Sequence, residues 1–269
     1  MDMHPLDRAT ALEPLSEGLW RGETAPDYMN VVGPFGGVTV ACLLNAVLKD
    51  PRRTDAPVAI TTNYVTGVRE GAFEIAVTLE RSGKYLQHWS VVQRQQGGVC
   101  STATVVTGRR SETFAHQPAQ MPDAPPPDSL PQMTPPDTLS FLKCYDFRFV
   151  DGAPQLEAPF ESLQAARSLA WMADRPGRPL DWLSLAALSD GFPFRLLTVR
   201  GGMAPMGTVS LSTYFLTTEE ELAEQGSAPI LGRAAGSRFN AHFHDQKVTF
   251  WDSKGRVLAS GAQVVWFKE

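Results

Sequence analysis

Hydrophobic and polar positions follow the same order in two stretches of the chain. Small and apolar residues that begin in a Gly- or Pro-marked turn predict one helix over residues 35–49 and another over residues 180–194. A β-rich, aromatic-bearing segment follows each helix, at residues 63–65 and 213–215. This repeated order predicts an internal duplication.

Alternation of apolar and polar positions predicts strands after each helix. Residues 72–81 place Phe73, Ile75, Val77 and Leu79 on one face, as expected for a half-buried strand. Turn residues separate further strand candidates, which lie at residues 85–95 and 99–107 in the first half and at 145–150, 166–172, 207–216, 229–244, 246–252 and 256–268 in the second. Each half is therefore expected to be an α+β unit, with antiparallel strands around one helix.

A proline-rich segment separates the two halves. Residues 116–137 contain eight prolines, a density that neither a helix nor a central strand tolerates. An extended linker is the natural interpretation. The predicted organisation is a first unit at residues 1–115, a linker at 116–140 and a second unit at 141–269.

The two copies differ at one position that matters chemically. Aligning the helices places Asn45 opposite Asp190, so the second copy carries a carboxylate in an apolar helix where the first carries an amide. This asymmetry predicts one active site per chain.

Several short segments carry a family resemblance. Phe35-Gly36-Gly37 opens the first helix, Ser189-Asp190 lies in the second, Gly207-Thr208 opens the next strand, and Leu258–Gln263 lies in the last strand. In this order the chain resembles double-hotdog acyl-CoA thioesterases of the bacterial acyl-CoA thioesterase II type. The resemblance implies two antiparallel sheets, each wrapped around a long central helix, in a tandem repeat.

The same resemblance implies a site for the attacking water. By order and local context, the family's Asp, Thr and Gln fall on Asp190, Thr208 and Gln263. The chain departs from the family after Thr208, and alternation places Thr208, Ser210 and Ser212 on one strand face. Ser210 and Ser212 therefore remain alternatives for the hydroxyl.

The predicted residues fit hydrolysis of a thioester. A carboxylate among apolar neighbours has a raised pKa, which makes Asp190 a better general base near neutrality. Gly36 and Gly37 open a helix whose free N–H groups suit an oxyanion or a substrate carbonyl. The second helix, which opens at residues 180–182, is the alternative source of these donors.

Composition narrows the function classes. The chain has 269 residues, a net charge of -5 and a pI near 5.6, which argues against a general nucleic-acid binder. It contains no run of 18 apolar residues, so no membrane span is expected, and its N-terminus does not resemble a secretory signal. The three cysteines have no CxxC spacing, and Cys42 and Cys100 lie among apolar and small residues, as expected for buried free thiols. Together these features indicate a cytoplasmic protein.

The remaining motifs leave two alternatives open. His242 and His244, two apart on one strand face, lack a third ligand nearby, so neither a metal nor another cofactor is expected. The expected partner is an acyl-CoA substrate, with a homodimer or higher homo-oligomer also expected from exposed sheet edges. A non-catalytic acyl-thioester binding or assembly protein and a hotdog hydratase or dehydratase are the alternatives, although neither helix carries the histidine that a hydratase or dehydratase needs.

Overall fold

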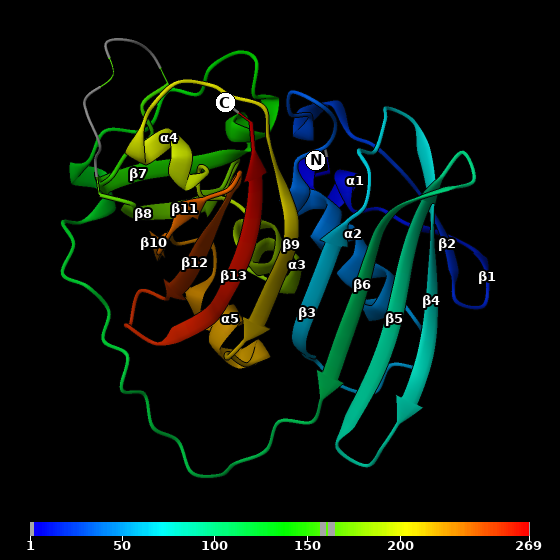
Figure 1. The fold of residues 1–269 in the computed structure, drawn as a ribbon. Helices are drawn as coiled ribbons and strands as arrows, with labels where there is room; N and C mark the ends of the chain where they lie inside the picture. Colours follow the sequence, from blue (N-terminus) through cyan, green and yellow to red (C-terminus); the bar gives the residue numbers. More distant parts are fainter. Residues whose placement is uncertain (1–2, 157–159, 161–164, 269) are drawn as a thin grey trace.

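One antiparallel sheet runs through both halves of the computed structural model, which describes residues 3–156, 160 and 165–268 (Figure 1). Twelve of its 13 strands follow the order β1-β2-β4-β5-β6-β3-β9-β13-β12-β10-β8-β7, and β11 pairs with β12 at one side. The strands are β1 (Glu13–Ser16), β2 (Leu19–Glu23), β3 (Pro57–Tyr64), β4 (Ala72–Ser82), β5 (Leu86–Gln95), β6 (Gly98–Gly108), β7 (Tyr145–Asp151), β8 (Arg167–Asp174), β9 (Met206–Phe215), β10 (Ile230–Ala235), β11 (Phe239–Asn240), β12 (Phe243–Trp251) and β13 (Val257–Phe267).

The two halves join edge to edge through β3 and β9. These strands pair antiparallel, with Thr61 opposite Ser212 and their hydroxyl oxygens 2.9 Å apart. The prediction of two separate sheets is therefore wrong. An edge strand leaves unpaired N–H and C=O groups, and pairing β3 with β9 satisfies them on both sides.

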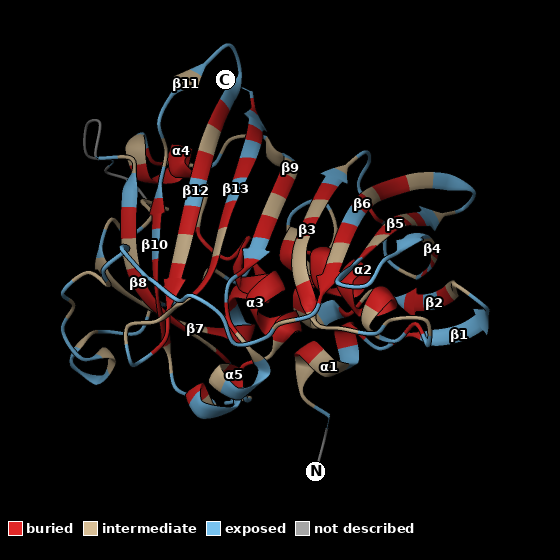
Figure 2. Cartoon of the chain, turned by 90° about the horizontal axis from the view of Figure 1, so that it is seen from below, coloured by how far each residue is buried: buried red, intermediate tan, exposed pale blue. Residues whose placement is uncertain are grey.

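Two helices lie together inside the curve of the sheet. The helix α2 (Gly36–Leu48) falls within the predicted range, and it packs against α3 (Trp182–Leu188). Residues Gly37–Val47 of α2 and all of α3 are buried, as Figure 2 shows at the centre of the molecule. A helix that is apolar on all sides is stable only when it is surrounded, which is why the sheet wraps these two.

The second helix is shorter than predicted. Instead of continuing toward residue 194, α3 ends at Leu188, and a separate helix α4 (Arg195–Val199) follows. Gly191 and Pro193 lie between them, and a proline disfavours the helical conformation of the residue before it. Asp190 therefore lies in the turn after α3, not within a helix as predicted.

Further short elements were not predicted from the sequence. They are α1 (Pro5–Ala9), β1, β2, the 3-10 turns η1 (Pro26–Tyr28), η2 (Pro127–Ser129) and η3 (Ser140–Cys144), and α5 (Glu219–Gln225). The helix α5 begins after Thr218, whose side chain forms a reciprocal capping box with Glu221. None of the described helices is long and apolar enough to cross a membrane.

The proline-rich segment passes around the outside of the second half (Figure 1). Its contacts with that half include a 2.8 Å hydrogen bond from Trp171 Nε1 to the Pro125 carbonyl and another from Gln117 Nε2 to the Gly255 carbonyl. These contacts tie the segment to the surface of the second half.

Candidate active site

Asp190 of the second half lies against the start of α2 in the first half. Asp190 is 7% exposed, and a Cβ added to Gly36 would lie 2.5 Å from its Oδ2. A Cβ on Gly37 would lie 2.3 Å from the Ala187 carbonyl oxygen of α3. Both glycines are therefore required for the close approach of the two helices and of the carboxylate, not for an unusual backbone conformation.

Burial raises the pKa of Asp190 to about 7. The side chains of Gln263 and Thr208 and the Gly37 N–H act in the opposite direction, because they are donors close to the charged form. Desolvation is the stronger influence. A carboxylate with such a pKa exchanges a proton readily near neutral pH.

A β-bulge brings Thr208 and Gln263 together. Along β13, Val264 faces Ser210 but Val265 faces Thr208, so β9 has one extra residue, Val209, at this point. The bulge turns Thr208 to the inner face, where its hydroxyl donates to Gln263 Oε1 at 2.8 Å.

The bulge also separates Thr208 from the two serines. Ser210 lies opposite Val264, which is 42% exposed, and Ser212 contacts Thr61 between β9 and β3. The prediction that the hydroxyls at 208, 210 and 212 share one face is therefore wrong, because it assumed an unbroken alternation.

Two buried polar atoms in this cluster have complementary chemistry. Asp190 Oδ1 is an acceptor and Gln263 Nε2 is a donor, and each lies buried without a hydrogen bond of normal geometry within the described residues. The amide is near enough to favour the charged carboxylate, but the two atoms do not bond directly. Leaving such atoms unpaired in a protein interior is costly.

Tyr64 is a site residue that the sequence placed only in a β-rich run. Its hydroxyl donates to the Gly36 carbonyl oxygen at 2.9 Å. A Cβ added to Gly36 would lie 3.1 Å from the same hydroxyl oxygen. Burial and then the charge of Asp190 hold the pKa of Tyr64 well above its usual value. The phenol thus stays protonated and fixes the first turn of α2.

The start of α2, rather than that of α3, faces Asp190. The first helical hydrogen bond of α2 runs from Thr39 N–H to Phe35 O, which leaves the N–H groups of Gly36, Gly37 and Val38 without acceptors in the helix. At α3, by contrast, Asp181 caps the helix by accepting from Ser184 N–H, and Arg178 pairs with Asp181. The alternative helix start is therefore already occupied by its own cap.

The histidine pair does not share a strand face. His242 has a positive φ of 68° in the turn before β12, whereas His244 is 2% exposed and faces inward. The prediction of two histidines on one face is therefore wrong, because β12 begins only at Phe243.

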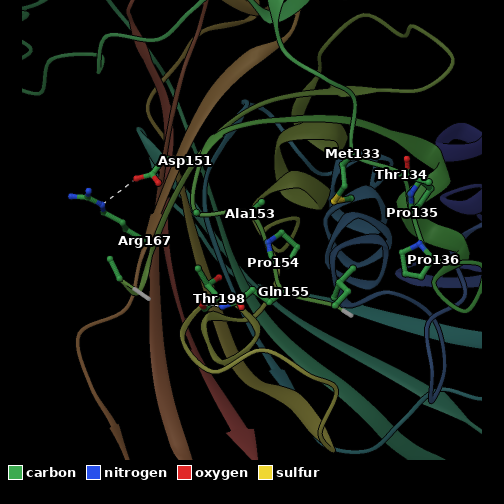
Figure 3. A pocket seen from close by; sticks show the side chains of 13 residues that line it. Met133, Thr134, Pro135, Pro136, Asp151, Ala153, Pro154, Gln155, Arg167 and Thr198 are labelled. Atoms are coloured by element: carbon green, nitrogen blue, oxygen red, sulfur yellow. Dashed lines mark hydrogen bonds and ion pairs between the residues drawn. The ribbon is translucent and has the colours of Figure 1, made fainter. Parts of the chain in front are cut away.

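A large cavity lies elsewhere in the second half (Figure 3). Its volume is about 960 Å³, and an ion pair between Arg167 and Asp151 stands at its edge. The linker and the segments after β7 and before β8 supply most of its walls. The lining residues are Met133, Thr134, Pro135, Pro136, Asp151, Gly152, Ala153, Pro154, Gln155, Leu156, Ala165, Arg167 and Thr198. None of the residues around Asp190 lines it.

Comparisons with known proteins place the chain in a family. Residues 25–108 match the model of the acyl-CoA thioesterase N-terminal domain, and residues 118–267 match that of the acyl-CoA thioesterase C-terminal domain. The chain belongs to the acyl-CoA thioesterase family. No curated protein matches it significantly in sequence.

Solved structures agree on the fold. A hot-dog-fold protein of unknown function from Alicyclobacillus acidocaldarius is 35% identical, with a TM-score of 0.94 over 100% of this chain and 99% of that one. An acyl-CoA thioesterase II from Mycobacterium marinum is 18% identical, with a TM-score of 0.75 over 98% of each chain. The dehydratase domain of PpsC from Mycobacterium tuberculosis is 15% identical, with a TM-score of 0.56 over 99% of this chain and 100% of that one. The last two likenesses show the fold alone.

Proposed function

We propose that this member of the family hydrolyses an acyl-CoA thioester to a free acid and CoA, with one site per chain built from two hotdog units. The observation that carries the proposal is Asp190, a buried carboxylate with a pKa of about 7 beside a helix start and a Thr–Gln pair. The family match supports the thioester chemistry. The asymmetry between Asn45 and Asp190 supports a single site.

Asp190 is the general base in this mechanism. Its carboxylate accepts a proton from a water molecule as the water oxygen attacks the thioester carbon. The new C–O bond forms, the carbonyl oxygen becomes an oxyanion, and the C–S bond then breaks. CoA leaves as a thiolate and takes up a proton, either from Asp190 or from solvent. A thiolate is a good leaving group, so no strong acid is needed.

Gln263 and Thr208 hold the water. The Thr208 hydroxyl donates to Gln263 Oε1, which leaves Gln263 Nε2 free to donate to the water oxygen. Asp190 Oδ1, also unpaired, is the acceptor for a water proton. A water between Gln263 Nε2 and Asp190 Oδ1 would form a hydrogen bond with each. Neither Thr208 nor Gln263 would compete with Asp190 as the base.

The first turn of α2 supplies the donors for the carbonyl oxygen. The N–H groups of Gly36 and Gly37 have no acceptor within the helix and lie at the positive end of the helix dipole. Gly37 N–H is also close to Asp190. The base and the oxyanion donors are thus adjacent, as attack on one carbon requires.

The test is release of free thiol from short, medium and long acyl-CoAs by the wild type and by Asp190→Asn. Hydrolysis that falls by at least about a hundredfold in the variant, with acyl-CoA binding retained, supports the proposal. Asp174→Asn is a matched control, because Asp174 is also buried with a raised pKa but lies outside this cluster.

Other results would redirect the assignment. Full activity in Asp190→Asn would place the base elsewhere. Binding of acyl-CoA by the wild type without thiol release would favour a binding protein. Hydration of an enoyl-CoA without thiol release would favour a hydratase.

A further inference from the structure

Arg195 is a buried cation that the proposed reaction does not use. Its side chain, at the start of α4, is 0% exposed, and no carboxylate lies within ion-pairing distance of it in the described part of the chain. Burial lowers the pKa of Arg195 to about 10. Keeping an uncompensated guanidinium in the interior is costly, so its neighbours are informative.

Neutral acceptors surround this guanidinium. Nε donates to Gln246 Oε1 at 2.7 Å, Nη1 donates to Ser168 Oγ at 2.7 Å, and Nη2 donates to the Pro193 carbonyl oxygen at 2.5 Å. A guanidinium has donors only, so the Gln246 atom that faces it must be the oxygen. This contact fixes the orientation of the Gln246 amide and turns Nε2 away from Arg195.

Gln246 stands directly beside Gln263. The two residues are opposite each other across β12 and β13, both on the inner face, and they are 0% and 3% exposed. Opposite residues of antiparallel strands have Cβ atoms about 5 Å apart, which brings the ends of two glutamines into reach of each other. Gln246 Nε2 is buried and has no hydrogen bond of normal geometry to any described residue.

We infer that Arg195 and Gln246 are positioning residues that set which way the Gln263 amide points. Arg195 holds the oxygen of Gln246, so Gln246 can offer only its NH2 group to Gln263. Because this NH2 group is a donor, it favours the orientation of Gln263 that places Oε1 beside it and disfavours the one that places Nε2 there. The inference rests on the proposed function, since the Gln263 orientation matters only if Nε2 binds the attacking water.

Thr208 alone does not determine this orientation. A hydroxyl can donate to Oε1 or accept from Nε2, so the Thr208–Gln263 contact would survive a flip of the amide. A flipped amide would present an oxygen, instead of a donor, to the water and to Asp190. Arg195 can only donate, so it fixes the orientation of the Gln246 amide. The Gln246 amide then favours one of the two orientations of the Gln263 amide.

The decisive variant is Gln246→Glu. The introduced carboxylate would pair with Arg195, so the fold is retained, but it offers Gln263 an oxygen in place of an NH2 group and favours the flip. We expect kcat, measured on the high-pH plateau, to fall at least about tenfold with KM within about twofold. Thermal unfolding should occur at the same temperature or higher. Gln246→Met, which removes the NH2 group without adding charge, should lower kcat in the same direction.

Two controls separate positioning from general disruption. Ser168→Ala removes another acceptor of Arg195 without touching Gln263, so it should lower the unfolding temperature and leave kcat unchanged. In a Gln263→Ala background, Gln246→Glu should cause no further fall in kcat, because its effect acts through Gln263.

The outcomes are distinguishable. Normal kcat in both Gln246 variants, while Gln263→Ala is impaired, would overturn the inference and leave the proposed function standing. Equal losses from Gln246→Glu with and without Gln263 would also overturn it. Wild-type activity in Gln263→Ala would remove both the inference and the proposed role of Gln263.

Discussion

Asp190 and Gly36 come from opposite halves of the chain, yet the carboxylate lies where a Gly36 side chain would begin. The candidate site therefore exists only when the two halves are docked with α2 beside α3. The residue matched to Asp190 in the first half has a different task. Asn45 donates from Nδ2 to the Thr10 carbonyl at 2.7 Å and thereby holds the N-terminal segment.

The contact between Gly36 and Asp190 predicts a large effect of one methyl group. Gly36→Ala would place Cβ 2.5 Å from Oδ2, so the carboxylate must move, and kcat/KM for acyl-CoA hydrolysis should fall by about a hundredfold. Gly207→Ala is the matched control, since a Cβ there meets nothing within 4 Å although it precedes Thr208. Equal activity of the two variants in a thiol-release assay would show that the Gly36 contact is unimportant.

Sequence patterns predicted the parts of this site that depend on local context. The apolar surroundings of Asp190 and the glycines at 36 and 37 can be recognised in the sequence itself, whereas Thr208 and Gln263 were assigned through the family resemblance. The structure brings these residues together, and it confirms the position of the first helix and the burial of Cys42 and Cys100.

What the sequence missed depends on tertiary contacts. The bulge at Val209 interrupts a strand whose alternation looks regular, so the face of Thr208 followed only from the register with β13. The pairing of β3 with β9 joins segments that carry no mutual signal in the sequence. The role of Tyr64 also needed the fold, because its partner, the Gly36 carbonyl, lies in a distant element.

The bulge leads to a paired prediction for two neighbouring hydroxyls. Thr208→Val keeps the shape of the side chain but removes the donor to Gln263 Oε1, so kcat should fall about tenfold or more. Ser210→Ala removes a hydroxyl on the outer face and should leave kcat unchanged. Steady-state kinetics with one acyl-CoA decides this, and a loss confined to Ser210→Ala would mean that the strand register is different in the active enzyme.

The raised pKa of Asp190 predicts the pH dependence of hydrolysis. The base must be deprotonated, so kcat/KM should rise with pH and reach a plateau above a midpoint near 7. Asp174→Asn should retain the same midpoint, because that carboxyl group lies outside the site. A profile measured with a substrate stable to alkaline hydrolysis that is flat between pH 5 and 9 would exclude Asp190 as the titrating base.

The same pKa predicts that Asp190 lowers the stability of the fold. Its pKa rises from 3.8 to about 7 on folding, so the folded state holds a proton that the unfolded chain has lost between these pH values. The free energy of unfolding therefore decreases as pH rises from about 4 to about 7, and the loss is complete above pH 7. A shift of this size corresponds to a penalty on the order of 4 kcal/mol.

Asp190→Asn removes the titrating group, so it should be more stable than the wild type at pH 8 and nearly equal to it at pH 4. Denaturant unfolding of both proteins at the two pH values measures the difference. The idea fails if the variant has no advantage at pH 8, or if its advantage is the same at both. If Asp190→Asn is more stable and no longer hydrolyses the substrate, then burial of Asp190 both raises its pKa for catalysis and destabilises the fold.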